Sequence, residues 1–576
     1  MEEPYSTLAL PGLPTHSTSP RLDKLCTEVL LLIFEELPPR DVVTVSRVCQ
    51  RFNKITTPII YHTVPLERLL DERHVKEILS RRQENAFSHT QQLLIGGGIK
   101  YGDIEDGDPT QKDTKPGDVK QDDIKRFLTN TKKLQSVKYA YSPGCGEKPI
   151  CPWKQVHDMG IHLREGNARL SVDKFIPTDP INDTWKIRGI FPNAGISKSL
   201  VALKMGSASV PHSESALQIL KKLLLRTPLL ETFHYIDCRA QRVLGRQFKF
   251  EEGQRLPPFK DLMLKNYDWK HDAEEVKLHW DFSRIRSLAL LMIPVYKFLE
   301  SVPFSDLTGL RHLHAEDYNE VIEHQNRQYA TEYQNRQLAT KNLHVLIKDH
   351  IKSLQTLNIT CFIGYFHIDA LLAHAESLTS LVLRDHDVSN NLQQHRPVLS
   401  AENLTVLSRS MSSLETLEID IDHTAFPEAC LSALCQFPRL HTLVLHTKTV
   451  IQPNSNHRPG QDPDLTRAYD CFTTLVKQRR GPTKWQRVVI NVGGWREREV
   501  IPRAGRRPRV GRRETYTYYR ACVFQRYFVL EESAFGQEDL IYEELPPKDE
   551  GLTHFYGNLR TGKSLEPQSQ VAEATR

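Results

Sequence analysis

The sequence predicts a mixed α/β protein in which a small N-terminal helical cluster precedes a long, irregular α/β solenoid. Residues 25–55, "LCTEVLLLIFEELPPRDVVTVSRVCQRFNKI", form a short apolar segment with helical spacing. Between residues 200 and 445 a leucine-rich phrase returns nine times, with helical stretches before most of its copies. One helix–strand unit cannot bury its own apolar edges, so units of this kind are expected to stack on their neighbours.

The first helix is expected to follow Thr27, whose side chain can cap it, with Glu28 near the positive end of the helix dipole. Its apolar positions are Val29, Leu30, Ile33, Phe34 and Leu37, with Leu31 and Leu32 widening the apolar arc. Pro38 disfavours continuation of this helix, and Pro39 suits the start of the next one.

The second helix is expected to carry the apolar stripe Val42, Val45, Cys49 and Phe52, and Pro58 is expected to close the unit. Two or three helices of this size cannot bury so much apolar surface against one another. The surplus face therefore packs either on the rest of the chain or on another polypeptide. The residues alone leave both possibilities open.

This segment resembles the F-box motif, in particular that of filamentous-fungal proteins. The resemblance rests on Leu25, "EVL" at 28–30, "IF" at 33–34, Leu37, "DV" at 41–42, "VC" at 48–49, Phe52 and "TPIIYHTV" at 57–64. It places the F-box at residues 21–64, with Cys26 standing where the family usually has a proline. F-box proteins bind a Skp-type adaptor and, through it, a cullin. The resemblance assigns the adaptor contact, or its immediate support, to Leu25, Cys26, Val29, Ile33, Phe34, Leu37 and Val48. Which of these form the F-box's own core stays open.

The repeated phrase is a loosely kept Leu-x-x-Leu-x-Leu. Its copies begin at residues 200, 230, 259, 285, 310, 354, 378, 414 and 440, with weaker examples at 90 and 134. Apolar residues alternate in the last four positions, which predicts a strand in each copy.

The repeats resemble the leucine-rich-repeat family, which often follows an F-box. The family's asparagine or cysteine is replaced at most copies by residues such as Tyr267, Ile293 or Phe362. We therefore expect an irregular leucine-rich-repeat-like solenoid over residues 65–450. An ordinary α/β domain with leucine-rich strands is the alternative.

Several segments interrupt or flank the repeats. An acidic loop is expected at 96–123, and a solvated helical extension at 324–340, where Gln-Asn-Arg-Gln occurs twice. Residues 466–561 form a strand-rich C-terminal segment with an Arg-rich loop. Residues 1–20 and 562–576 are expected to be disordered tails.

Positive charge is concentrated in one segment. Residues 479–513 hold 12 Lys or Arg and 2 Asp or Glu, whereas the whole chain has a net charge of only +5. The residues of a polyanion contact would be Arg506, Arg507, Arg509, Arg512 and Arg513. A solvated loop, a nuclear-import signal and a patch for nucleic acid or an acidic partner all remain open. No aromatic residues interleave with these arginines, so nucleic acid is the less favoured partner.

No catalytic, phosphate-binding or zinc-binding motif is present, so we expect no enzyme activity, cofactor or metal site. No run of 18 apolar residues occurs, so no membrane span is expected. The N-terminus lacks the pattern of a secretion signal, which favours the cytoplasm, the nucleus or both.

The combined pattern predicts a non-catalytic substrate-recognition subunit of a Skp–cullin–F-box ubiquitin ligase. The F-box would bind the adaptor, and the repeats would bind a protein substrate whose identity the sequence does not give. Two alternatives remain: an adaptor-binding scaffold without a ubiquitin-ligase role, and a nucleic-acid-binding protein that uses the basic patch.

Overall fold

The computed structural model describes residues 22–66, 88–96, 99–100, 119–120, 131, 133–140, 168–175, 198–205, 214–236, 247–317, 326–386, 397–422, 427–448, 463–479, 483–498, 520–531, 541–545 and 563–564. The chain divides into two compact units, Met1–Ala202 and Leu203–Arg576, which are described separately. The Arg-rich loop, the N-terminal tail and most of the acidic loop and C-terminal tail lie outside the described residues.

The first unit begins with a helical cluster. It consists of the 3-10 turn η1 (Leu22–Lys24) and the helices α1 (Thr27–Glu35), α2 (Pro39–Ser46) and α3 (Gln50–Ile60). The second helix starts at Pro39, as predicted. The predicted cap of α1 was wrong by one residue. Cys26 is the N-cap, because its carbonyl accepts the first hydrogen bond of the helix, from the amide of Leu30. The side chain of Cys26 makes no capping hydrogen bond.

The expected stripe on the second helix is divided between two helices. α2 ends at Ser46, and Cys49 is the N-cap of α3, where its Sγ accepts the amide of Phe52 at 3.4 Å. Pro58 was expected to close the unit but lies inside the last turn of α3. The helix continues past it because the amide of Tyr61 still reaches the carbonyl of Thr57.

Four strands of the first unit form a parallel sheet. They are β1 (Thr63–Leu66), β2 (Gln92–Gly96), β5 (Ser136–Ala140) and β6 (Arg169–Phe175), paired in that order. The weaker copies of the phrase, at residues 90 and 134, coincide with β2 and β5. β6 was missed, although Leu170 and Val172 alternate with polar residues. Two short strands, β3 (Ile99–Lys100) and β4 (Val119–Lys120), pair with each other inside the expected acidic loop.

The division between the units falls inside β7 (Leu200–Met205). In the second unit a parallel sheet runs in chain order through β8 (Thr232–Ile236), β9 (Asp261–Lys265), β10 (Ser287–Ile293), β11 (His312–Asp317), β12 (Thr356–Cys361), β13 (Ser380–Asp385), β14 (Thr416–Asp420), β15 (Thr442–Lys448) and β16 (Arg487–Arg498). All nine main copies of the phrase coincide with strands. β17 (Arg520–Glu531), β18 (Ile541–Leu545) and β19 (Lys563–Ser564) then add antiparallel pairs.

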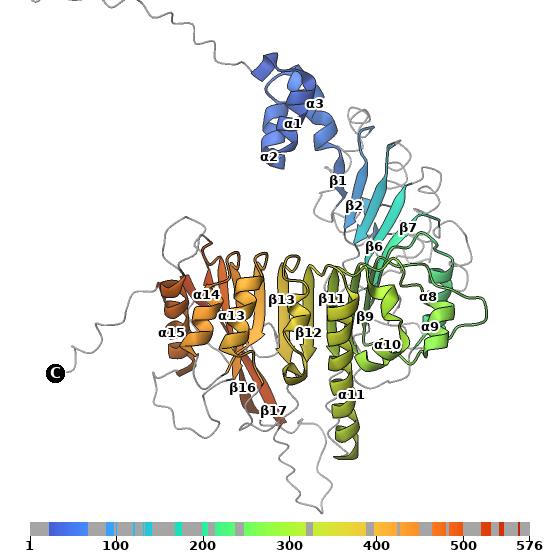
Figure 1. Cartoon of the computed structure of the whole chain (residues 1–576). Coiled ribbons are helices and arrows are strands. Elements are labelled where there is room, and N and C mark those ends of the chain that lie inside the picture. The colour runs from blue at the N-terminus through green and yellow to red at the C-terminus, as the bar shows by residue number, and fades with distance from the viewer. Residues whose placement is uncertain are drawn as a thin grey trace, which may run out of the picture. The chain divides into compact units, whose positions relative to one another are not determined.

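Helices connect most of these strands. They are α8 (Glu214–Leu225), α9 (Ala273–His279), α10 (Val295–Ser301), α11 (Asn326–Val345), α12 (Asp369–Leu372), α13 (Ala401–Ser410), α14 (Glu428–Cys435) and α15 (Pro463–Gln478), with short turns η5 (Phe304–Leu307), η6 (Leu346–His350) and η7 (Ile363–Tyr365). Figure 1 shows α10, α11, α13, α14 and α15 along one face of the parallel sheet. Residues 326–340 of the helical extension expected at 324–340 lie in α11, and residues 324–325 lie outside the described residues.

The leucines of the phrase form rows across the sheet. Register partners at the second strand position are buried from strand to strand, as with Leu357, Leu381, Leu417 and Leu443. The residues between them lie on the opposite side of the sheet and are mostly half-buried. We call the first, third and fifth positions of β11–β16 the open face.

Aspartates at the ends of β11 and β13 accept hydrogen bonds from backbone amides that follow the neighbouring strands. Asp317 Oδ1 accepts the amide of Val295 at 3.3 Å, and Asp385 Oδ1 accepts the amide of Ile363 at 3.0 Å. Tyr267, Ile293 and Phe362 are buried, and of these three the Tyr267 hydroxyl also accepts a backbone amide, that of Phe248, at 2.8 Å. These buried carboxylates thus accept hydrogen bonds from backbone amides where the chain turns away from the sheet.

Candidate functional site

Helix α1 carries apolar side chains on two faces. Its inner face contributes Leu30 and Phe34, which are 0% and 2% exposed. Its outer face contributes Val29, Leu32 and Ile33, which are 39%, 64% and 39% exposed. These three residues are spaced at i, i+3 and i+4, so they lie on one side of the helix. We call them the outer stripe.

The inner face of α1 is buried within the helical cluster itself. Leu30 and Phe34 form a core with Phe52 and Ile55 of α3. The rings of Phe34 and Phe52 meet edge to face, with centroids 5.3 Å apart. The cluster therefore has a complete small core, and the outer stripe is apolar surface beyond what that core uses.

The structure separates the predicted adaptor residues into two groups. Val29, Ile33, Val48 and Cys26 are exposed, with Val48 at 66%. Leu25 and Leu37 are partly buried against the core, and Phe34 lies inside it. Phe34 cannot touch an adaptor in this conformation, because its ring is already enclosed. Of the two roles that the resemblance left open, contact or support, its burial favours support.

Sequence reasoning missed part of the exposed apolar surface. Leu32 was counted only as widening the apolar arc of the first helix, yet it is the most exposed residue of the outer stripe. Leu22 and Val43 are also exposed, at 50% and 38%. An excess of apolar residues on both faces of a nine-residue helix was the available signal.

Cys26 stands at the position where a proline was expected. The backbone entry to α1 is nevertheless held by hydrogen bonds. The amide of Leu25 donates to the carbonyl of Leu22 at 3.2 Å, and Arg51 Nη2 donates to the carbonyl of Leu25 at 2.5 Å. The turn before α1 is thus tied to α3 without a proline.

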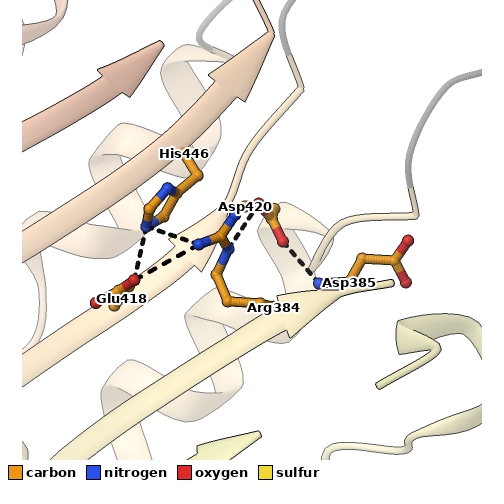
Figure 2. Close-up of polar contacts among 5 residues, drawn as sticks. All are labelled: Arg384, Asp385, Glu418, Asp420 and His446. Carbon is orange, nitrogen blue, oxygen red and sulfur yellow. Dashed lines mark hydrogen bonds and ion pairs between the residues drawn. The ribbon is translucent and has the colours of Figure 1, made fainter. Parts of the chain in front are cut away.

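A second group of polar side chains in mutual contact lies on the open face of the second unit. Figure 2 shows Arg384 of β13, Glu418 and Asp420 of β14 and His446 of β15 in mutual contact. We call these four residues the open-face cluster. Arg384 Nε donates to Asp420 Oδ1 at 3.0 Å, and the amide of Asp385 donates to Asp420 Oδ2 at 2.7 Å. The guanidinium Nη1 lies 3.6 Å from Glu418 Oε1.

His446 links the two ends of the cluster. Its Nε2 lies 2.7 Å from Glu418 Oε1 and 3.1 Å from Arg384 Nη1. One nitrogen cannot donate to the carboxylate and accept from the guanidinium at the same time. The shorter contact fits Nε2–H donating to Glu418, with the guanidinium close by but not hydrogen-bonded to the ring.

The pKa of Glu418 is lowered from its ordinary value of 4.5. Burial is the largest single influence and raises this pKa, but the hydrogen bond and charge of His446, together with the charge and hydrogen bond of Arg384, outweigh it. Glu418 is therefore a carboxylate at neutral pH. Its side chain is 29% exposed, whereas that of Asp420 is 1% exposed.

Across the described ranges, no group of three His, Cys, Asp or Glu side chains is placed to hold a metal ion. Burial raises the pKa of the Cys361 and Cys471 thiols well above their ordinary value, which disfavours a nucleophilic thiolate there. Among the helices that the structure describes, none is both long and apolar enough to span a membrane.

A family model described as F-box-like matches residues 22–66, which include the helical cluster and β1. The chain thus carries an F-box-like domain. No curated protein matches the chain. Among solved structures, the complex of Rad7 and Elc1 from yeast is similar over 76% of this chain and 92% of that chain, at 10% identity and a TM-score of 0.28. At that TM-score the likeness supports no statement about fold or function.

Proposed function

We propose that this chain is a non-catalytic substrate-recognition subunit of a Skp–cullin–F-box ubiquitin ligase. The observation that carries the proposal is the outer stripe, which stays exposed on an F-box-like domain whose own core is complete. Exposed apolar side chains gathered on one helix are typical of a protein-binding surface. A Skp-type adaptor is the partner that an F-box-like domain implies.

The second unit would supply substrate recognition. We propose that its parallel sheet and flanking helices form a leucine-rich-repeat-like solenoid, since helices line one face of the sheet and the described side chains of the other face are mostly half-buried. Solenoids present such faces to their partners. Holding the adaptor at one place and a substrate at another raises their effective concentration, so the chain itself need not make or break bonds. The cytoplasm, the nucleus or both are the compartments where this role belongs.

Co-purification of the full-length chain with a Skp-type adaptor and a cullin tests the proposal. Both proteins should be recovered with the wild type and lost with a Val29→Asp, Ile33→Asp double variant, because two carboxylates would then face an apolar contact. Lys54→Glu changes the charge of an exposed residue on α3 and serves as the control.

The outcomes separate the possible roles. Adaptor recovered without cullin would favour a scaffold over a ligase subunit. Equal recovery of the adaptor with the wild type and the double variant would reject the outer stripe as the docking surface. Circular dichroism of each variant verifies that loss of binding is not loss of folding.

A further inference from the structure

The segment that leads into α1 adds to the apolar surface of that helix. Cys26 stands three residues before Val29 and seven before Ile33, so it extends the outer stripe by one helical turn. Cys26 is exposed, and so is Leu22 at the start of the segment. The position of Leu22–Cys26 therefore decides how far the surface of α1 continues beyond the helix itself.

A side chain of α3 fixes the backbone of this segment. The bond from the amide of Leu25 to the carbonyl of Leu22 is local and does not tie the segment to the helices. Arg51 Nη2, by contrast, donates to the carbonyl of Leu25 at 2.5 Å. The guanidinium is always charged, so this hydrogen bond is stronger than one between neutral groups. The side chain of Leu25 also packs against the core, but apolar packing is non-directional and does not orient a carbonyl.

The backbone of Cys26 has a conformation that a proline would fix by itself. Its φ of −64° and ψ of 159° lie in the polyproline region, and a proline ring locks φ at about −65°. Among the described residues the amide of Cys26 donates no hydrogen bond, so a proline would remove none there. The conformation at residue 26 can thus be secured by a ring in the chain or by a bond from another helix.

We propose that Arg51 is a positioning residue for the adaptor contact, and that it holds Leu22–Cys26 in line with the outer stripe. This inference rests on the proposed function and deepens it, because it adds the entry segment to the surface that the adaptor covers. A segment that is fixed before binding loses less conformational freedom when the partner binds. Loss of the bond from Arg51 should therefore weaken adaptor binding without unfolding the domain.

Biolayer interferometry of the full-length chain on an immobilised Skp-type adaptor tests this role. Arg51→Met keeps an unbranched side chain but removes its donors, and it should weaken binding on the order of fivefold. Lys54→Met removes an equal charge from an exposed position of the same helix and should leave binding unchanged. Amides of α1 and α3 should keep their hydrogen-exchange protection in both variants.

Substitutions at residue 26 separate positioning from direct contact. In a Cys26→Pro background the ring fixes the backbone, so Arg51→Met should weaken binding by less than about twofold. Cys26→Ala removes the thiol without fixing φ, so in that background Arg51→Met should keep its full effect. A guanidinium that touched the adaptor directly would give the same loss in all three backgrounds.

That equal loss would overturn the inference. Unchanged binding of Arg51→Met would do the same, and so would a loss of exchange protection throughout α1 and α3, which would mark Arg51 as a residue of the domain's fold alone. The Val29→Asp, Ile33→Asp variant is measured in parallel. If the wild type binds and this variant does not, docking through the outer stripe stands even when Arg51→Met has no effect. No binding by the wild type would overturn both proposals.

Discussion

Phe34 and Leu32 are two residues apart on α1 and should respond in opposite ways to truncation. Phe34 is 2% exposed and packs against Phe52, whereas Leu32 is 64% exposed. We expect Phe34→Ala to unfold the F-box-like domain and so abolish adaptor binding. Leu32→Ala should leave the domain folded and weaken adaptor binding directly.

The magnitudes follow from burial. Truncating a buried phenylalanine to alanine costs about 3–5 kcal/mol. A domain of this size has a free energy of unfolding of roughly 2–7 kcal/mol at typical values per residue, so Phe34→Ala removes most or all of it. Leu32→Ala should change stability by less than about 0.5 kcal/mol. Fully burying a leucine contributes about 1.5–3 kcal/mol, so covering the exposed part of Leu32 would contribute about 1–2 kcal/mol to binding. That corresponds to an affinity loss of roughly 5- to 30-fold.

Hydrogen–deuterium exchange of the full-length chain measures the first effect without isolating the domain. Amides of α1 and α3 should lose protection in Phe34→Ala and keep it in Leu32→Ala. Biolayer interferometry with an immobilised Skp-type adaptor measures the second effect. If Phe34→Ala left the exchange of α1 and α3 unchanged, or if Leu32→Ala reduced protection as much, the division of α1 into a core face and a binding face would be wrong.

Three further predictions concern single groups. Arg384→Met removes a donor from the buried Asp420 and should lower the free energy of unfolding by about 1.5–3 kcal/mol, measured by urea denaturation; an unchanged midpoint would contradict this. Because folding lowers the pKa of Glu418, its ionised form stabilises the protein above its ordinary pKa of 4.5, and this contribution is lost as the pH falls through the lower folded value. The melting temperature of the wild type should thus exceed that of Glu418→Gln at neutral pH, and this difference should disappear on strong acidification. A difference that grew at low pH would contradict a pKa of Glu418 lowered by folding. Burial raises the pKa of Cys435 to about 11, whereas Cys26 is exposed. Iodoacetamide should therefore label Cys26 before Cys435, and bound adaptor should slow the labelling of Cys26. Peptide mass spectrometry measures both effects.

The local elements of this protein could be predicted closely from the sequence. The period-two placement of leucines located the strands of the second unit, because alternation of side chains across a sheet is a purely local property. Helical spacing and the adjacent prolines located α1 and the start of α2 for the same reason. The misplacements occurred at boundaries, such as Cys26 and Pro58, where one backbone hydrogen bond decides which residue ends a helix.

The sequence by itself determined that α1 carries more apolar residues than one face can hold, and that the leucines of the phrase point to one side of a sheet. Only the tertiary structure decided that Phe34 belongs to the core while Leu32 faces solvent, because that depends on where α3 places Phe52. It also brought Arg384, Glu418 and His446 together from three strands. Residues up to 62 positions apart come into contact there because parallel pairing aligns equivalent positions of successive units.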